Sequence, residues 1–124
     1  MDLNDLALKH AVKQQFAPEK PLPPTGKQFG LKKDEHGFIV TTTDFDDDQV
    51  SYCIDWGDGT TLEWTAYYPS GSEVEIDHQW ESGGLYDIRV KAKDVHGFES
   101  PWSNPMSIVL LKHMYTMKAP CFFI

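Results

Sequence analysis

The sequence predicts an all-β fold, an antiparallel β-sandwich, with a short helix at the N-terminus. Stretches in which apolar and polar residues alternate recur along the chain, and turn signals rich in Gly, Asp and Pro separate them roughly every ten residues. No helical pattern interrupts these stretches after residue 20, and such strands bury their apolar sides by packing two sheets face to face. The chain has 124 residues, of which 40% are hydrophobic and 13% aromatic, and this suffices for a single core.

The first segment, residues 1–19, is predicted to be a helix followed by a linker. Residues 2–16 place a narrow apolar stripe at helical spacing, with Asp2 or Asn4 available as the N-cap. The stripe consists of Leu3, Leu6, Ala7, His10 and Ala11. A lone helix of this length is marginal in water, so it must dock, pair with another copy as a homo-oligomer, or belong to a preceding domain. Four prolines between residues 18 and 24 predict a stiff connector and a domain boundary near residue 20.

Residues 20–112 are predicted to form the sandwich, and residues 113–124 a C-terminal tail. The clearest strand signal runs from Val50 to Trp56, where alternate residues are apolar. Asp58-Gly59 after it predicts a tight primed turn, because such a turn needs positive φ. The remaining strands are expected over residues 28–31, 37–43, 61–65, 73–80, 85–93 and 106–111.

The charge of the chain argues against two classes of partner. The formal net charge is −8 and the pI about 4.9, so neither a nucleic acid nor an anionic membrane surface is expected to bind. No run of about 18 apolar residues is present, and no membrane span is expected. The N-terminus lacks a basic segment followed by an apolar core, so no secretory signal is expected in this chain. Two locations stay open: the cytoplasm, or the cell exterior if the chain is a piece of a longer exported protein.

The two cysteines, Cys53 and Cys121, are expected to be free thiols, with Cys53 partly buried. A disulfide between them requires the tail to fold back over the sheet. The last four residues, 121–124, formally fit a C-terminal lipidation box, but two aromatics there are atypical and chance is the better account. The apolar residues 122–124 are expected to pack against another surface or to mark a truncated terminus.

Several motifs follow one another along the predicted sandwich. They are Tyr52-x-Ile54-Asp55-Trp56-Gly57-Asp58-Gly59, His78-x-Trp80, Gly84-x-Tyr86-x-Ile88-x-Val90-x-Ala92 and Asp94-x-x-Gly97. In combination, over residues 20–112, they resemble the PKD (polycystic kidney disease) domain family. The variant found in archaeal and bacterial surface proteins is especially similar, since it has Asp-Pro-Asp-Gly-Asp where residues 44–48 lie and Ser-x-Trp-Ser where residues 100–103 lie.

The resemblance implies an immunoglobulin-like sandwich of about seven strands, in which Tyr86 is a core residue and could form a tyrosine corner. It also implies an extracellular or cell-surface role without catalysis, as a spacer, an adhesion module, or a binding module for proteins and sometimes polysaccharides. Two alternatives stay open. One is a calcium-stabilised structural module of tandem-domain surface proteins, and the other is an accessory substrate-binding module of a secreted hydrolase.

The acidic loop is the candidate metal site. Asp44, Asp46 and Asp48 alternate, so their oxygens can converge on one Ca²⁺ in a bent loop, and no other cofactor is expected. Asp55 lies eleven residues after Asp44, the offset of the last EF-hand ligand, but Gln49 stands where that motif needs glycine. The alternative is a solvated turn in which the carboxylates bond their own backbone.

Two other polar sites are expected to be structural. His78 has no second His or Cys at ligand spacing, so it is expected to hydrogen-bond inside the sandwich and not to bind a metal. Asp55 and Asp58 suggest a hydrolase carboxylate pair, but Asp58 belongs to the turn and no pocket-forming segment surrounds them. No catalytic residue is therefore predicted.

Aromatic residues make up the candidate binding surface. Trp64, Tyr67, Tyr68 and Trp102 could stack on sugars or form a contact with a protein. The alternative is packing in the core and at sheet edges. This alternative is favoured for Trp64, Trp80 and Trp102, because the resembled family also carries aromatics at those places.

Overall fold

The computed structural model describes residues 15–113, which contain seven β-strands and no helix. The strands are β1 (Phe29–Leu31), β2 (Glu35–Val40), β3 (Val50–Asp55), β4 (Thr61–Leu62), β5 (Val74–Gln79), β6 (Gly84–Asp94) and β7 (Met106–Leu111). Each one coincides with a predicted strand, although β4 is only two residues long and β2 begins and ends earlier than expected. The predicted helix over residues 2–16 lies outside the described residues, apart from its last two positions, which are not helical.

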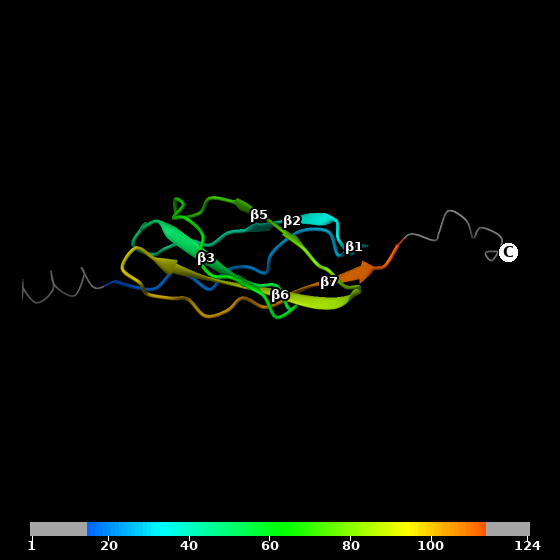
Figure 1. The fold of residues 1–124 in the computed structure, drawn as a ribbon. Helices are drawn as coiled ribbons and strands as arrows, with labels where there is room; N and C mark the ends of the chain where they lie inside the picture. Colours follow the sequence, from blue (N-terminus) through cyan, green and yellow to red (C-terminus); the bar gives the residue numbers. More distant parts are fainter. Residues whose placement is uncertain (1–14, 114–124) are drawn as a thin grey trace, which may run out of the picture.

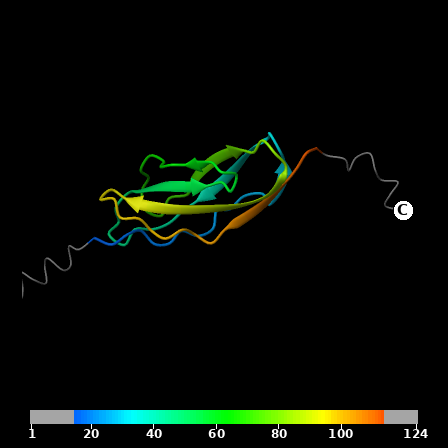
Figure 2. The same cartoon turned by 60° about the horizontal axis from the view of Figure 1, so that its bottom comes forward.

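The strands form two sheets that pack face to face, which confirms the predicted immunoglobulin-like sandwich. The larger sheet has the order β1-β7-β6-β3-β4, and the smaller one pairs β2 with β5. In Figure 1 the β2–β5 pair lies above β6 and β7, and Figure 2 shows the same two layers from another side. The central strand β6 is paired along both edges, with β3 on one side and β7 on the other.

One pairing differs from the predicted antiparallel arrangement. β1 runs parallel to β7, with Phe29 opposite Val109 and Leu31 opposite Leu111, whereas the other pairs are antiparallel. Parallel neighbours need a long crossover connection, and here the whole segment from β2 to β6 provides it. The expectation that all strands are antiparallel is therefore wrong at this edge of the larger sheet.

Large aromatic side chains fill the space between the sheets. Phe38, Trp56 and Trp80 lie with their ring centroids 5.8 Å apart in each pair. The polar tips of Trp80 and Tyr52 have partners, which burial favours: Trp80 Nε1 donates to the carbonyl oxygen of Trp56 at 3.2 Å. The hydroxyl of Tyr52 likewise accepts from the backbone N–H of Thr42 at 3.0 Å. These inward positions are the ones that the alternating pattern predicts.

Strand β3 is buried on both faces, which the alternation does not predict. Ser51 and Cys53 lie on the face opposite Tyr52 and Ile54, and both are buried, Cys53 more fully than the partial burial expected for it. The segment after β4 covers this side, because Ser51 Oγ donates to the carbonyl oxygen of Thr65 and Thr65 N–H donates to the carbonyl oxygen of Tyr52. Cys53 is a free thiol, as expected, and Cys121 lies outside the described residues.

The turn after β3 differs from the predicted primed turn. Positive φ occurs at Gly57 (79°) and Gly59 (88°), and Asp58 between them is not in the left-handed region. Instead, Asp58 Oδ1 accepts from the backbone N–H of Thr60 at 2.9 Å. Position 57 also has no room for a side chain, because a Cβ on Gly57 would lie 2.5 Å from the carbonyl oxygen of Asp87 on β6.

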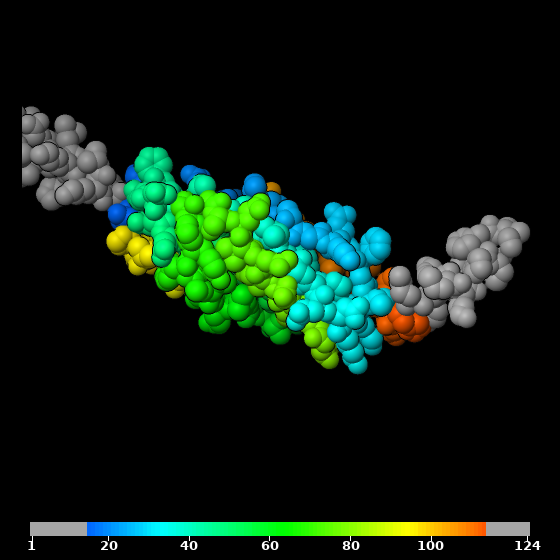
Figure 3. Space-filling view, turned by 90° about the horizontal axis from the view of Figure 1, so that it is seen from above, coloured from blue at the N-terminus to red at the C-terminus, as the bar shows by residue number. Residues whose placement is uncertain are grey.

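The described chain begins and ends at opposite ends of an elongated body (Figures 1 and 3). Residues 15–18, the acidic loop at residues 44–48 and the loop at residues 95–98 gather at one end. β1 and the end of β7 lie at the other. No helix among residues 15–113 is long and apolar enough to cross a membrane.

Candidate functional site

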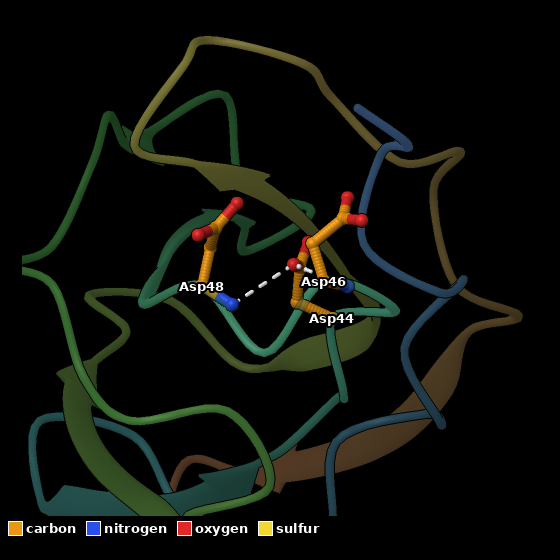
Figure 4. Close-up of side chains that lie close together, drawn as sticks. All are labelled: Asp44, Asp46 and Asp48. Carbon is orange, nitrogen blue, oxygen red and sulfur yellow. Dashed lines mark hydrogen bonds between the residues drawn. The ribbon is translucent and has the colours of Figure 1, made fainter. Parts of the chain in front are cut away.

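The acidic loop between β2 and β3 folds around the carboxylate of Asp44 (Figure 4). Asp44 Oδ2 accepts hydrogen bonds from the backbone N–H groups of Asp46 and Asp48, each at 3.0 Å. Asp47 has a positive φ of 59°, which helps the chain to reverse direction. The structure thereby brings the three alternating carboxylates together, with one oxygen of each within 4.8 Å of the others. The same loop also contains the carboxylate-to-backbone hydrogen bonds that are expected if the aspartates only stabilise a turn.

One oxygen of Asp44 has no partner in this network. The side chain is only 5% exposed, and its buried Oδ1 accepts no hydrogen bond. Burial raises the pKa of Asp44 above its ordinary value of 3.8, and it outweighs the backbone hydrogen bonds from Asp48 and Asp46. The negative charges of Asp48 and Asp94 raise this pKa further. A buried, unpaired carboxylate oxygen costs free energy, and a bound cation removes that cost.

Asp94, at the end of β6, repeats the arrangement. Its side chain is fully buried, Oδ1 accepts from the backbone N–H groups of His96 and Phe98 at 2.9 and 3.0 Å, and Oδ2 has no partner. The pairing of β3 with β6 places Asp94 opposite Val50, two residues beyond Asp48. Sequence reasoning treated Asp94 only as part of a turn motif. Its burial beside the acidic loop depends on a strand pairing that no local pattern reveals.

The chain that leads into the domain also contacts the acidic loop. The backbone N–H of Phe16 donates to Asp46 Oδ2 at 2.9 Å, and the Phe16 ring packs edge to face on Phe45 with centroids 5.2 Å apart. From the loop at residues 95–98, His96 Nε2 lies 3.6 Å from Asp48 Oδ2. The acidic loop therefore contacts two other segments of the chain at one end of the sandwich.

The donor set at this end suits a hard divalent cation. Ca²⁺ is bound by several oxygens, mainly from carboxylates, and the unpaired oxygens of Asp44 and Asp94 are of this kind. Asp55, at the EF-hand offset, does not belong to the cluster. It lies at the far end of β3, where its Oδ1 accepts from the backbone N–H of Gly57 at 2.9 Å.

Asp58 and His78 form a polar pair inside the turn region. Asp58 Oδ2 lies 2.9 Å from His78 Nε2, and the imidazole ring stacks on Trp56 with centroids 4.3 Å apart and 2° between the planes. Burial alone would raise the pKa of Asp58, but the hydrogen bonds from Thr60 and His78 outweigh it and hold the pKa below 3.8. The prediction that His78 hydrogen-bonds within the sandwich is confirmed.

Trp64 and Trp102 lie beside two lysines on the outer face of β6: Lys91 is near both rings, and Lys93 is near Trp64. Lys91 Nζ lies 4.9 Å from the Trp102 ring centroid and 5.7 Å from that of Trp64, and Lys93 Nζ lies 4.4 Å from Trp64. Lys91 also pairs with Glu99 at 2.8 Å. These are cation–π distances, so ammonium groups occupy indole faces on which a sugar would stack. We call Trp64, Lys91, Lys93 and Trp102 the tryptophan–lysine cluster.

The two predicted tyrosines have other contacts. Tyr68 pairs with Val50 through two backbone hydrogen bonds and packs against the core. The Tyr67 hydroxyl reaches the carbonyl oxygen of Asp94 at 3.4 Å. Tyr86 forms the tyrosine-corner bond that the resemblance implies, because its hydroxyl donates to the carbonyl oxygen of Ser82 at 2.8 Å.

Solved structures with a similar fold are PKD domains. The PKD domain of an M14-like peptidase from Thermoplasmatales archaeon SCGC AB-540-F20 is 36% identical, covers 78% of this chain and 98% of that chain, and has a TM-score of 0.73. The PKD domain of the human VPS10 domain-containing receptor SorCS2 is 17% identical over 83% of this chain and 84% of that chain. Its TM-score is 0.42. No family model and no curated protein matches the chain.

Proposed function

Because this chain belongs to the PKD domain family, we propose that it serves as a non-catalytic binding or spacer module at a cell surface, within a longer exported protein. One observation supports the spacer role above all: the described chain begins at one end of an elongated sandwich and ends at the other (Figure 1). Such a module separates whatever precedes it from whatever follows. The aspartates of the hydrolase-like pair have structural partners instead, Asp55 with Gly57 and Asp58 with Thr60 and His78.

The tryptophan–lysine cluster is the proposed contact surface of the module. Tryptophan is enriched at the centres of protein interfaces, and this cluster presents two partly exposed tryptophans, Trp64 and Trp102. The ammonium groups above the indoles favour a protein partner that offers acidic side chains over a neutral polysaccharide. A polysaccharide held for a neighbouring hydrolase is the alternative partner.

A binding assay with paired variants tests this surface. The double variant Trp64→Ala, Trp102→Ala is compared with Leu22→Ala, which changes a residue that is 67% exposed in the proline connector. Immobilised protein is probed with the neighbouring domains of the same polypeptide and with insoluble polysaccharides. We expect the double variant to lose binding and Leu22→Ala to keep it. Equal binding by both variants, or no binding by the parent, contradicts the proposal.

We also propose that the module is stabilised by Ca²⁺ at Asp44, Asp46, Asp48 and Asp94. The unpaired buried oxygens of Asp44 and Asp94 favour this second function. A cation there would neutralise carboxylates that otherwise repel one another. Because Phe16 bonds directly to Asp46, the ion would also fix the chain that leads into the sandwich, and tandem modules would be held rigidly.

Thermal melting in calcium and in EDTA tests the ion. Ligand linkage predicts that the free energy of unfolding rises by about 2.7 kcal/mol at a calcium concentration one hundred times the dissociation constant. Magnesium at the same concentration serves as the control, because it binds reluctantly to all-protein cages. Identical melting curves in millimolar calcium and in EDTA contradict the proposal.

A further inference from the structure

An apolar patch lies on the outer face of the larger sheet, at the end away from the acidic loop. Phe29, Val109 and Leu85 lie directly opposite one another on three neighbouring strands, and Leu111 continues the row along β7. These four side chains, which we call the β1–β7 patch, are 68%, 42%, 68% and 44% exposed in that order. Since alternate residues of a strand face the same side, all four point away from the core.

A hollow adjoins the patch along the free edge of the sheet. It has a volume of about 440 Å³ and is lined by residues 27–31 and Leu111. β1 is the outermost strand, so no further strand among the described residues closes this side. Contiguous exposed apolar side chains beside a hollow mark a contact surface, whereas apolar residues scattered singly over a surface do not.

We propose that residues 114–124 dock on the β1–β7 patch. This segment follows β7 after only two intervening residues, and eight of its eleven residues are apolar. They are Met114, Tyr115, Met117, Ala119, Cys121, Phe122, Phe123 and Ile124. The patch is three strands wide, which is about 10 Å. Nine extended residues span about 30 Å, so the segment is long enough to turn back and lay Phe122 and Phe123 across Phe29 and Leu85.

The tether makes this segment a better occupant than a second copy of the chain. A short linker gives an attached segment an effective concentration in the millimolar range. Two separate copies, each with a formal net charge of −8, repel one another instead. The segment itself carries one charged side chain, Lys118, so little charge must be desolvated when it docks.

Paramagnetic broadening in the full chain tests the docking. A nitroxide is attached to Cys121, because Cys53 is buried, its pKa is raised by that burial, and it reacts slowly in the folded protein. We expect strong broadening of the methyl signals of Leu85, Val109 and Leu111. The methyl signals of Val40 and Val74, in the smaller sheet, should keep their intensity.

Two variants and a mixing experiment make the result decisive. The double variant Phe122→Ser, Phe123→Ser should restore the patch signals, and so should Leu85→Ser, whose exposed position leaves the fold intact. Broadening that persists in both variants, or that is absent from the parent, overturns the proposal. Labelled chains are also mixed with isotope-labelled Cys121→Ser chains. Broadening of the patch in that mixture means that a second copy covers it, which overturns the proposal as well.

Discussion

The turn at Asp58 and the two turns at Asp44 and Asp94 are built alike but completed differently. In each turn, one carboxylate oxygen accepts from the backbone N–H two residues later. At Asp58 the second oxygen meets His78, whereas at Asp44 and Asp94 it is buried without a partner. The same local motif can thus have partners for both carboxylate oxygens or leave one buried oxygen without a partner. The comparison separates structural aspartates from those proposed to bind a cation.

The largest effect is expected in the core beneath the Asp58 turn. Trp80 is fully buried, lies edge to face against His78 at 4.6 Å and donates to Trp56. Trp80→Ala leaves a cavity and is expected to lower the free energy of unfolding by about 3–5 kcal/mol, as measured by urea unfolding. Trp102→Ala is the control, with an expected loss below about 1 kcal/mol because the ring is 38% exposed. Losses of equal size would remove the distinction between core and surface tryptophans.

The second-largest effect is expected at Asp44, where a substitution should abolish the stabilisation by calcium. Asp44→Asn keeps an oxygen for the N–H groups of Asp46 and Asp48 but removes the charge. In thermal melting, removing calcium from a concentration one hundred times the dissociation constant should lower the free energy of unfolding of wild type by about 2.7 kcal/mol. The free energy of unfolding of the variant should not change. In EDTA the variant should be at least as stable as wild type, since it buries no unpaired charge. The control is Asp77→Asn, which changes an exposed residue of β5 and should still be stabilised by calcium. If calcium no longer stabilised this control, the proposed calcium site at Asp44 would be contradicted.

A smaller effect is expected at Asp58, and it depends on pH. Asp58→Asn weakens the bonds to Thr60 and His78 and should lower the free energy of unfolding by about 1–2 kcal/mol at neutral pH. The folded pKa of Asp58 lies below 3.8, so its stabilisation is present above that value and is lost as the pH falls through the folded pKa. Urea unfolding at several pH values measures this, with Asp55→Asn as the control. A difference from wild type that persists in strong acid would contradict the account.

The smallest effect lies outside both turns, in the tryptophan–lysine cluster. Lys93→Met removes the ammonium group above Trp64 and keeps most of the side-chain volume. We expect a loss of about 0.5–1 kcal/mol in the free energy of unfolding, because the contact is partly exposed. A matched change at Lys27, which is exposed beside the hollow at β1, should have no measurable effect. A loss above about 2 kcal/mol at Lys93 would mean that the cluster supports the fold more than a surface contact can.

The strands could be predicted because alternation is a local property of the sequence. The β7 bounds match the prediction residue for residue, and the predicted inward residues Tyr52 and Ile54 are fully buried. The parallel pairing of β1 with β7 could not be predicted, because it joins distant parts of the chain. The burial of Ser51 was missed for a related reason, since the residue that accepts its hydroxyl hydrogen bond, Thr65, is more than ten positions away.

The candidate metal site was only partly predictable. Asp44, Asp46 and Asp48 are neighbours in sequence, so their convergence follows from one bent loop. The register of β3 with β6 places Asp94 beside this loop, and a single sequence does not reveal that register. The contacts of Lys91 and Lys93 with these tryptophans were missed for the same reason, because the alternation along β6 indicates an outer face but not what lies above it.

Calorimetric titration of Ca²⁺ into wild type and Asp94→Asn tests the central claim most directly. The asparagine keeps an oxygen for the N–H groups of His96 and Phe98, so the turn is preserved while the charge is removed. We predict one ion per chain for wild type and at least about tenfold weaker binding for the variant, which corresponds to about 1.4 kcal/mol. Equal affinity in the two proteins, or no binding heat in wild type, would contradict the proposal that Asp44 and Asp94 bind Ca²⁺.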